Sequence, residues 1–101
     1  MDIELKYITP TSLYVKAFGR LDIDNAMPFG IKIKDEVEDN NVSSLTLDFA
    51  EVTFISSFGL KVILETYQVM QEPAVIKIIN ASDTVKHAFL LVGFDKFIDI
   101  K

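Results

Sequence analysis

The chain has 101 residues, half of them hydrophobic, and its 15 acidic and ten basic residues give a formal net charge of −5. This length supports a single domain, expected to span residues 1–101. Because the chain contains no cysteine, disulfides, thiolate catalysis and zinc–sulfur sites are excluded. The negative charge has the wrong sign for a protein that neutralises phosphates, so we expect no nucleic-acid partner.

No targeting or membrane segment is expected. The N-terminal residues Met1–Lys6 alternate polar and apolar side chains, unlike the basic region and apolar run of a signal peptide. The longest apolar stretches, such as Ala88–Gly93, fall far short of the roughly 20 residues that a membrane helix needs. We therefore expect a cytoplasmic protein with no membrane partner.

The chain begins with two predicted strands and a tight turn. Residues 2–8 alternate charged and apolar side chains, which is the periodicity of a strand. In residues 13–18 a second alternation sets Leu13, Val15 and Ala17 against Tyr14, Lys16 and Phe18. Thr9–Ser12, with a proline inside it, has the composition of a turn. This arrangement predicts an antiparallel hairpin.

A helix is expected next. Asp24 and Asn25 are good N-cap residues, and Pro28 would then lie in the first turn, where proline is tolerated. Gly30 weakens this helix by up to about 1 kcal/mol relative to alanine, and Asn40–Asn41 is expected to close it. Three apolar residues recur with the spacing of a buried helix face: Phe29, Ile33 and Val37.

The middle of the chain predicts a strand, a link and a second helix. Residues 43–49 have the alternation of a strand, expected to be central, and Val52–Ile55 is expected to form a short apolar link. The helix that follows is expected to end before Pro73. Its apolar face is predicted to comprise Leu60, Ile63, Leu64, Tyr67 and Met70.

The last third of the chain repeats the alternation. Residues 74–79 form a nearly continuous apolar run, typical of a buried strand. Ser82 is the expected cap of a third helix that Gly93 ends, and residues 97–100 are expected to form a last short strand. The order ββαβαβαβ predicts an α/β domain with a mixed sheet, an N-terminal hairpin and helices packed against the sheet.

The sequence carries no enzyme signature. Gly-rich phosphate loops, nucleophile elbows and His-rich metal patterns are absent. Asp22, Asp24, Asp48 and Glu51 lie near predicted strand ends, where acids serve more often as caps or loop residues than as acid–base pairs. His87, the lone histidine, is expected on a solvated helix face. We therefore expect a binding protein that is not an enzyme, with no catalytic residue, cofactor or metal.

The segment Asp48–Leu64 stands apart, because two serines precede a glycine at a strand-to-helix turn. One interpretation is that a serine caps the helix and satisfies one of its free amides. The other is that a hydroxyl here is open to a kinase. A phosphate at a helix N-terminus meets free amides and the positive end of the helix dipole, so it would switch partner binding without unfolding the domain.

This segment, DFAEVTFISSFGLKVIL, resembles the signature of STAS domains and, among them, of bacterial anti-sigma factor antagonists. Gly19–Asp22 is similar to the family's G-x-L-D after the second strand, and residues 80–96 are similar to its last helix and closing strand. The resemblance covers nearly the whole chain. The residues that match the central signature are Asp48, Val52, Phe54, Ile55, Ser56, Ser57, Gly59, Leu60, Val62, Ile63 and Leu64.

The resemblance implies a binding protein controlled by phosphorylation. Ser57 stands at the position of the family's phosphoacceptor, and the implied docking surface comprises Asp22, Ser56, Ser57, Phe58 and Gly59. The implied partners are an anti-sigma factor that is also a serine kinase, and a serine phosphatase. The unphosphorylated form is implied to bind the anti-sigma factor and so to release a sigma factor.

Phe58 departs from the family's pattern, which usually has a small residue there. The ring is expected either to crowd the acceptor or to anchor a particular partner. The alternative function is a STAS-like module that senses a small ligand or a lipid. In that case an apolar pocket near Phe54 and Phe58 is the working site, and Ser57 only caps the helix. A monomer or a weak dimer is expected.

Overall fold

Strands and helices alternate along the chain after an initial hairpin. The computed structural model describes residues 1–101. Its elements are β1 (Asp2–Thr9), β2 (Ser12–Leu21), α1 (Ile23–Asp39), β3 (Ser44–Ile55), α2 (Ser57–Val69), β4 (Val75–Ile79), α3 (Asp83–Leu91), the short 3-10 helix η1 (Phe94–Lys96) and β5 (Ile98–Ile100). This order confirms the predicted α/β class and the sequence ββαβαβαβ. None of the helices combines the length and the apolar character needed to span a bilayer.

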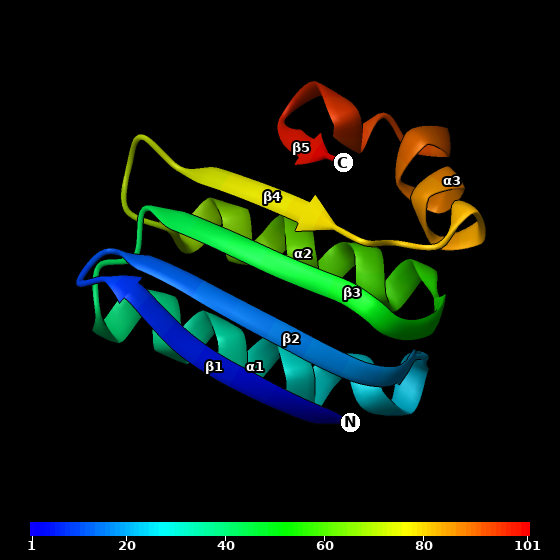
Figure 1. The fold of residues 1–101 in the computed structure, drawn as a ribbon, viewed down its shortest axis with the longest axis horizontal. Helices are drawn as coiled ribbons and strands as arrows, with labels where there is room; N and C mark the ends of the chain where they lie inside the picture. The colour runs from blue at the N-terminus through cyan, green and yellow to red at the C-terminus, as the bar shows by residue number, and fades with distance from the viewer.

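The strands form one sheet in the order β1-β2-β3-β4-β5, with β3 at its centre. β1 and β2 are antiparallel, as the hairpin predicts, whereas β2 to β5 run parallel. Parallel neighbours need a crossover connection. α1 and α2 provide two of these and lie side by side behind the sheet in Figure 1, while α3 lies beyond the end of β4.

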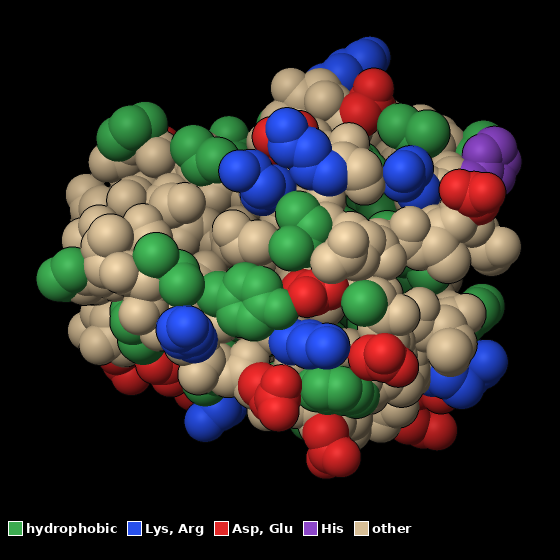
Figure 2. Space-filling view, viewed as in Figure 1, with side chains coloured by type: hydrophobic (Ala, Val, Ile, Leu, Met, Phe, Trp, Pro, Cys, Tyr) green, Lys and Arg blue, Asp and Glu red, His purple; other side chains and the backbone are tan.

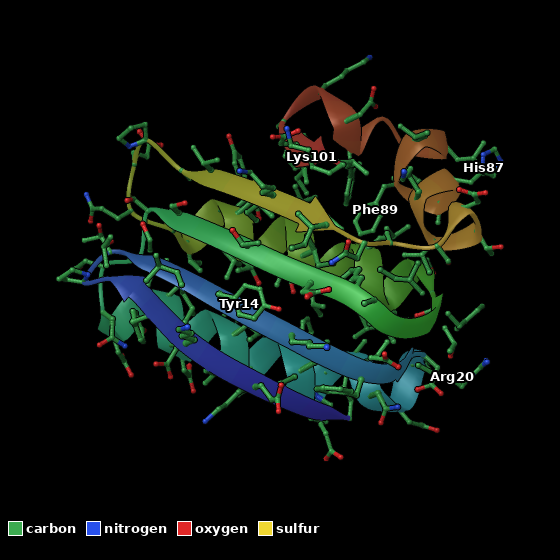
Figure 3. The ribbon with its side chains drawn as sticks, viewed as in Figure 1. Tyr14, Arg20, His87, Phe89 and Lys101 are labelled. Atoms are coloured by element: carbon green, nitrogen blue, oxygen red, sulfur yellow. The ribbon has the colours of Figure 1, made fainter.

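The core lies between the sheet and the α1–α2 layer. Leu13, Val15 and Ala17 of β2 are fully buried, whereas the alternate residues Tyr14 and Lys16 stand on the other face of the strand. Figure 2 shows that other face, where charged side chains lie among hydrophobic ones, and Figure 3 labels Tyr14 on it. The alternation along β2 therefore reflects a sheet covered by α1 and α2 on one side only.

Gly30 allows α1 and α2 to approach closely. A Cβ atom at this position would lie 2.8 Å from both Cβ and Cγ1 of Val62, well inside the roughly 3.5–4.0 Å at which carbon atoms pack best. The glycine therefore weakens α1 locally but permits close packing between the two helices.

The predicted start of α1 is wrong. The N-cap is Asp22 rather than Asp24 or Asn25, and its carboxylate accepts a hydrogen bond of 3.0 Å from the amide of Asn25. Because the helix begins at Ile23, Pro28 lies in the second turn, where it has no amide to donate to the carbonyl four residues earlier. The predicted end is confirmed, since α1 ends just before Asn40.

β3 is longer than predicted. Val52–Ile55, expected to form a link, continues the strand because β2 remains paired with it, with Leu21 opposite Ile55. The alternation breaks in the middle of β3, where Leu47–Phe49 is buried throughout and Ala50–Glu51 is exposed. The pairing has an irregularity at this point, which is why a strict period of two does not extend across it.

The buried surface of α2 is wider than predicted. Leu60, Ile63 and Met70 are buried, as expected, and Leu64 and Tyr67 are half-buried. Val62 and Thr66 are buried in addition, because α2 packs against α1 as well as against the sheet.

The predicted limits of α3 are confirmed. The hydroxyl of Ser82 accepts a hydrogen bond of 3.2 Å from the amide of Val85, and Gly93 follows the helix with a φ of 76°. Phe89 anchors the helix to the core through the rings of Phe49 and Phe94. His87 is exposed, as expected.

Candidate functional site

Two turns meet at one end of the sheet, where α1 and α2 begin. The first joins β2 to α1 at Asp22, and the second joins β3 to α2 at Ser56. The amide and the hydroxyl of Ser56 both donate hydrogen bonds to the carbonyl of Leu21, each at 2.9 Å. These bonds hold the two turns together, so both helices start at the right-hand end of the sheet in Figure 1.

The two serines have different roles. Ser56 is the N-cap of α2, and its hydroxyl oxygen accepts a hydrogen bond of 3.2 Å from the amide of Gly59. Ser57 is the first residue of the helix and is exposed, and its hydroxyl makes no hydrogen bond within the protein. The prediction that one serine caps the helix is therefore confirmed for Ser56, and the interpretation of Ser57 as the cap is wrong.

Gly59 is fixed by the contact between the two turns. A Cβ atom there would lie 2.7 Å from Cγ1 of Ile55 and 3.0 Å from the carbonyl oxygen of Leu21. Both neighbours are held by the sheet, because Leu21 and Ile55 are paired at the ends of β2 and β3. A larger residue at position 59 would push the start of α2 away from the first turn.

The first turn of α2 keeps two amides free. A helix leaves its first four amides without helical partners. In α2 the hydroxyl of Ser56 binds the amide of Gly59, and the carbonyl of Ser56 binds the amide of Leu60 at 3.0 Å. The amides of Ser57 and Phe58 have no such partner, so an anion at this position would meet two donors and the positive end of the helix dipole.

Asp22 and Arg20 border the two serines. The half-buried Asp22 carboxylate caps α1 and lies 3.8 Å from Nε of Arg20. The guanidinium of Arg20 lies 4.4 Å from the centre of the Phe54 ring, within the range of a cation–π contact. Figure 3 shows Arg20 at the same end of the sheet. The site thus carries one exposed cation beside a carboxylate already engaged as a helix cap.

Phe54 and Phe58 do not share a pocket. Phe58 is 48% exposed and lines a groove between α1 and α2. Phe54 lies under Arg20 at the end of β3 and is not part of this groove. The predicted apolar pocket is therefore present beside Phe58, but it does not include Phe54.

Asp48 belongs to a separate polar cluster. It is buried and accepts hydrogen bonds from the hydroxyl of Tyr14 at 2.5 Å, the amide of Ala50 at 3.0 Å and Nδ2 of Asn80 at 3.2 Å. Burial raises the pKa of Asp48, but these hydrogen bonds and the charge of Lys16 outweigh it and lower the pKa below its ordinary value. The bond to Asp48 is the main cause that raises the pKa of Tyr14 to about 12. The cluster ties β2, β3 and the segment after β4 together.

The sequence matches the model of the STAS domain family over residues 3–101. The chain belongs to the STAS domain family. This confirms the resemblance seen in the sequence, and it agrees with the pairing of an N-terminal hairpin, a parallel sheet and a serine turn before α2.

Several solved structures share this STAS fold. An anti-sigma factor antagonist from Mycobacterium paratuberculosis is 22% identical, with a TM-score of 0.82 over 98% of this chain and 85% of that chain. The unphosphorylated anti-sigma factor antagonist SpoIIAA is 18% identical, with a TM-score of 0.77 over 99% and 87%. The phosphorylated SpoIIAA of Bacillus is also 18% identical, with a TM-score of 0.71 over 99% and 91%.

In this STAS domain the residues predicted to form the docking surface lie together at the end of the sheet where α1 and α2 begin. Further residues lie beside them. The carbonyl of Leu21 accepts hydrogen bonds from Ser56, and no pattern of side chains in the sequence indicates this contact. Ile23, Met27 and Ile31 line the groove beside Phe58. Their spacing of four residues is visible in the sequence, but it is the same as the spacing of Phe29, Ile33 and Val37 on the core face, so it does not indicate a groove.

Proposed function

We propose that this STAS domain is an anti-sigma factor antagonist controlled by phosphorylation of Ser57. Its unphosphorylated form binds an anti-sigma factor that is also a serine kinase, and this binding releases a sigma factor. The observation that carries the proposal is the difference between the two serines. The amide and the hydroxyl of Ser56 take part in three hydrogen bonds, whereas the hydroxyl of Ser57 is exposed and forms none at the start of α2.

The first turn of α2 is suited to carry a phosphate without unfolding. The phosphate adds about −1.5 to −2 charges next to the free amides of Ser57 and Phe58 and the positive end of the helix dipole. Little packing is disturbed, because Ser57 is exposed. SpoIIAA, which has the same fold, exists in an unphosphorylated and a phosphorylated structure, and this supports the same capacity here.

The phosphate weakens the binding of the partner and leaves the fold intact. A kinase-type partner that reaches the Ser57 hydroxyl covers the neighbouring Asp22, Phe58 and Gly59. Phosphate then adds bulk and a charge that must be desolvated within this interface. Repulsion over longer distances is a minor contribution, because physiological salt screens it beyond about 8–10 Å. A serine phosphatase restores the binding form, and the domain itself acts as a binding module and a substrate.

Intact-mass spectrometry tests the acceptor. The domain is incubated with ATP and the kinase-type anti-sigma factors encoded in its own genome. We expect one added phosphate in the wild type and in Ser56→Ala, which keeps the acceptor, and none in Ser57→Ala. A phosphate that persists in Ser57→Ala, or no phosphate with a kinase that binds the domain tightly, contradicts the proposed acceptor.

Binding measurements test the switch. Ser57→Asp places a negative charge at the acceptor, so we expect it to weaken binding to the kinase at least about tenfold, equivalent to about 1.4 kcal/mol. Ser57→Ala is the control and is expected to bind like the wild type. The melting temperatures of both variants should stay close to that of the wild type because the side chain is exposed. Equal affinity of Ser57→Asp and the wild type would refute the switch.

A further inference from the structure

α1 presents a second apolar stripe that does not face the core. Ile23, Met27 and Ile31 are 59%, 69% and 52% exposed, and their spacing of four residues places them on one side of the helix. The core face of α1 is formed by other residues, among them Phe29 and Ile33. A helix that is apolar on two sides is expected to be covered on both.

The stripe forms one wall of a groove. The other wall comes from α2 and begins with Phe58, the floor contains Ala26 and Val62, and the volume is about 490 Å³. The close contact at Gly30 brings the helices together beneath the groove. Both helices begin at the same end of the sheet (Figure 1), so the groove runs along them. From Ile23 to Lys34 it extends about 16 Å, or three helical turns.

Three charged side chains line the groove: Lys34, Lys61 and Glu65. Lys34 and Glu65 form an ion pair at 3.2 Å across the two helices. Lys61 also lines the groove and has no ion-pair partner. One unpaired cation therefore borders an apolar groove, and this local charge favours a partner that places an acidic side chain there.

We propose that this groove receives an amphipathic helix of the kinase-type partner, with apolar side chains between α1 and α2 and an acidic side chain beside Lys61. The inference rests on the proposed function. A groove of about three helical turns, lined mostly by apolar residues, fits the i, i+3, i+4, i+7 anchors of a helix. Phe58 joins the groove to the acceptor, because it lines the groove and directly follows Ser57. A partner seated over the hydroxyl therefore reaches the groove without a gap.

Matched variants separate the groove from the rest of the apolar surface. Ile31→Ser removes a wall of the groove three residues before the Lys34–Glu65 pair, and its affinity for the kinase is expected to fall at least tenfold. Leu91→Ser is the control, because Leu91 is 72% exposed on α3 and lies outside the groove. It is expected to change the affinity less than twofold. Melting curves check that both variants are folded.

A second pair tests the charge. Lys61→Glu reverses the unpaired cation, whereas Lys32→Glu makes the same change of net charge at an exposed lysine of α1 outside the groove. Lys61→Glu is expected to weaken binding at least tenfold and to reduce its salt dependence. Lys32→Glu is expected to stay within twofold of the wild type.

Methyl spectra show contact directly. Met27 is exposed in the groove and Met70 is buried at the end of α2. On titration with the kinase, the Met27 methyl signal is expected to shift or broaden more than that of Met70. If the Met27 methyl signal does not change upon saturation with the kinase, the proposed position of the partner helix in the groove is overturned.

The outcomes distinguish the two proposals. Wild-type affinity in Ile31→Ser and Lys61→Glu, with weak binding in Ser57→Asp, overturns the groove and leaves the switch. Weak binding in both groove variants, with unchanged affinity in Ser57→Asp, supports the groove and refutes the switch. If the wild-type domain binds none of the kinases, both proposals are overturned. If both groove variants keep wild-type affinity for the kinase, and an added fatty acid displaces the kinase from the wild-type domain, the groove is assigned to a lipid instead.

Discussion

Replacing Ser56 by alanine is expected to destabilise the domain, whereas replacing Ser57 is not. Ser56→Ala removes the hydroxyl bonds to the amide of Gly59 at 3.2 Å and to the carbonyl of Leu21 at 2.9 Å. Loss of an N-cap costs about 0.5–2 kcal/mol. The carbonyl of Leu21 keeps its bond from the Ser56 amide, so no buried acceptor is left unpaired. We therefore expect a loss of about 1–2 kcal/mol in the free energy of unfolding.

The exposed Ser57 hydroxyl has no bond to lose, so Ser57→Ala is expected to stay within about 0.5 kcal/mol of the wild type. Urea denaturation followed by far-UV circular dichroism measures both values, and each kcal/mol corresponds to about 4–8 °C in melting temperature for a domain of this size. Ser56→Thr keeps the hydroxyl and is expected to recover most of the loss. A loss in Ser57→Ala equal to that in Ser56→Ala would refute the assignment of the cap.

Two further substitutions test the packing and the buried polar cluster. Gly30→Ala gains about 1 kcal/mol of helix propensity but overpacks the contact with Val62, which costs about 1–3 kcal/mol. We therefore expect a net loss of stability in urea denaturation, and a smaller loss when Gly30→Ala is made in the Val62→Ala background. A gain in stability would show that the helices can separate. Asp48→Asn removes a carboxylate with a lowered pKa, whose stabilisation is present above the unfolded pKa of about 3.9 and is lost as the pH falls through the folded pKa. The variant should lose about 1.5–3 kcal/mol at pH 7, and its gap to the wild type should narrow below about pH 4; a constant gap would contradict the charged role.

Local patterns in the sequence determined most of the elements, because strand alternation, helical spacing and capping residues act over a few neighbouring positions. Ser82 and Gly93 limit α3 as predicted for this reason. The same reasoning failed at the start of α1, where Asp22, Asp24 and Asn25 are all suitable caps. The end of β2 decides among them, since its pairing with β3 extends through Leu21 and leaves Asp22 as the first residue free to cap.

The sequence also determined where the candidate site lies, because the serine turn, the glycine and the family signature are contiguous. It did not determine which serine is free. That depends on the carbonyl of Leu21, which comes from a position 35 residues earlier and binds Ser56. The groove beside Phe58 likewise depends on how α1 and α2 pack, and Gly30 lets α1 approach Val62. Sequence patterns report the period of each element, whereas the partner of a hydrogen bond and the space between two helices are set by how distant elements pack.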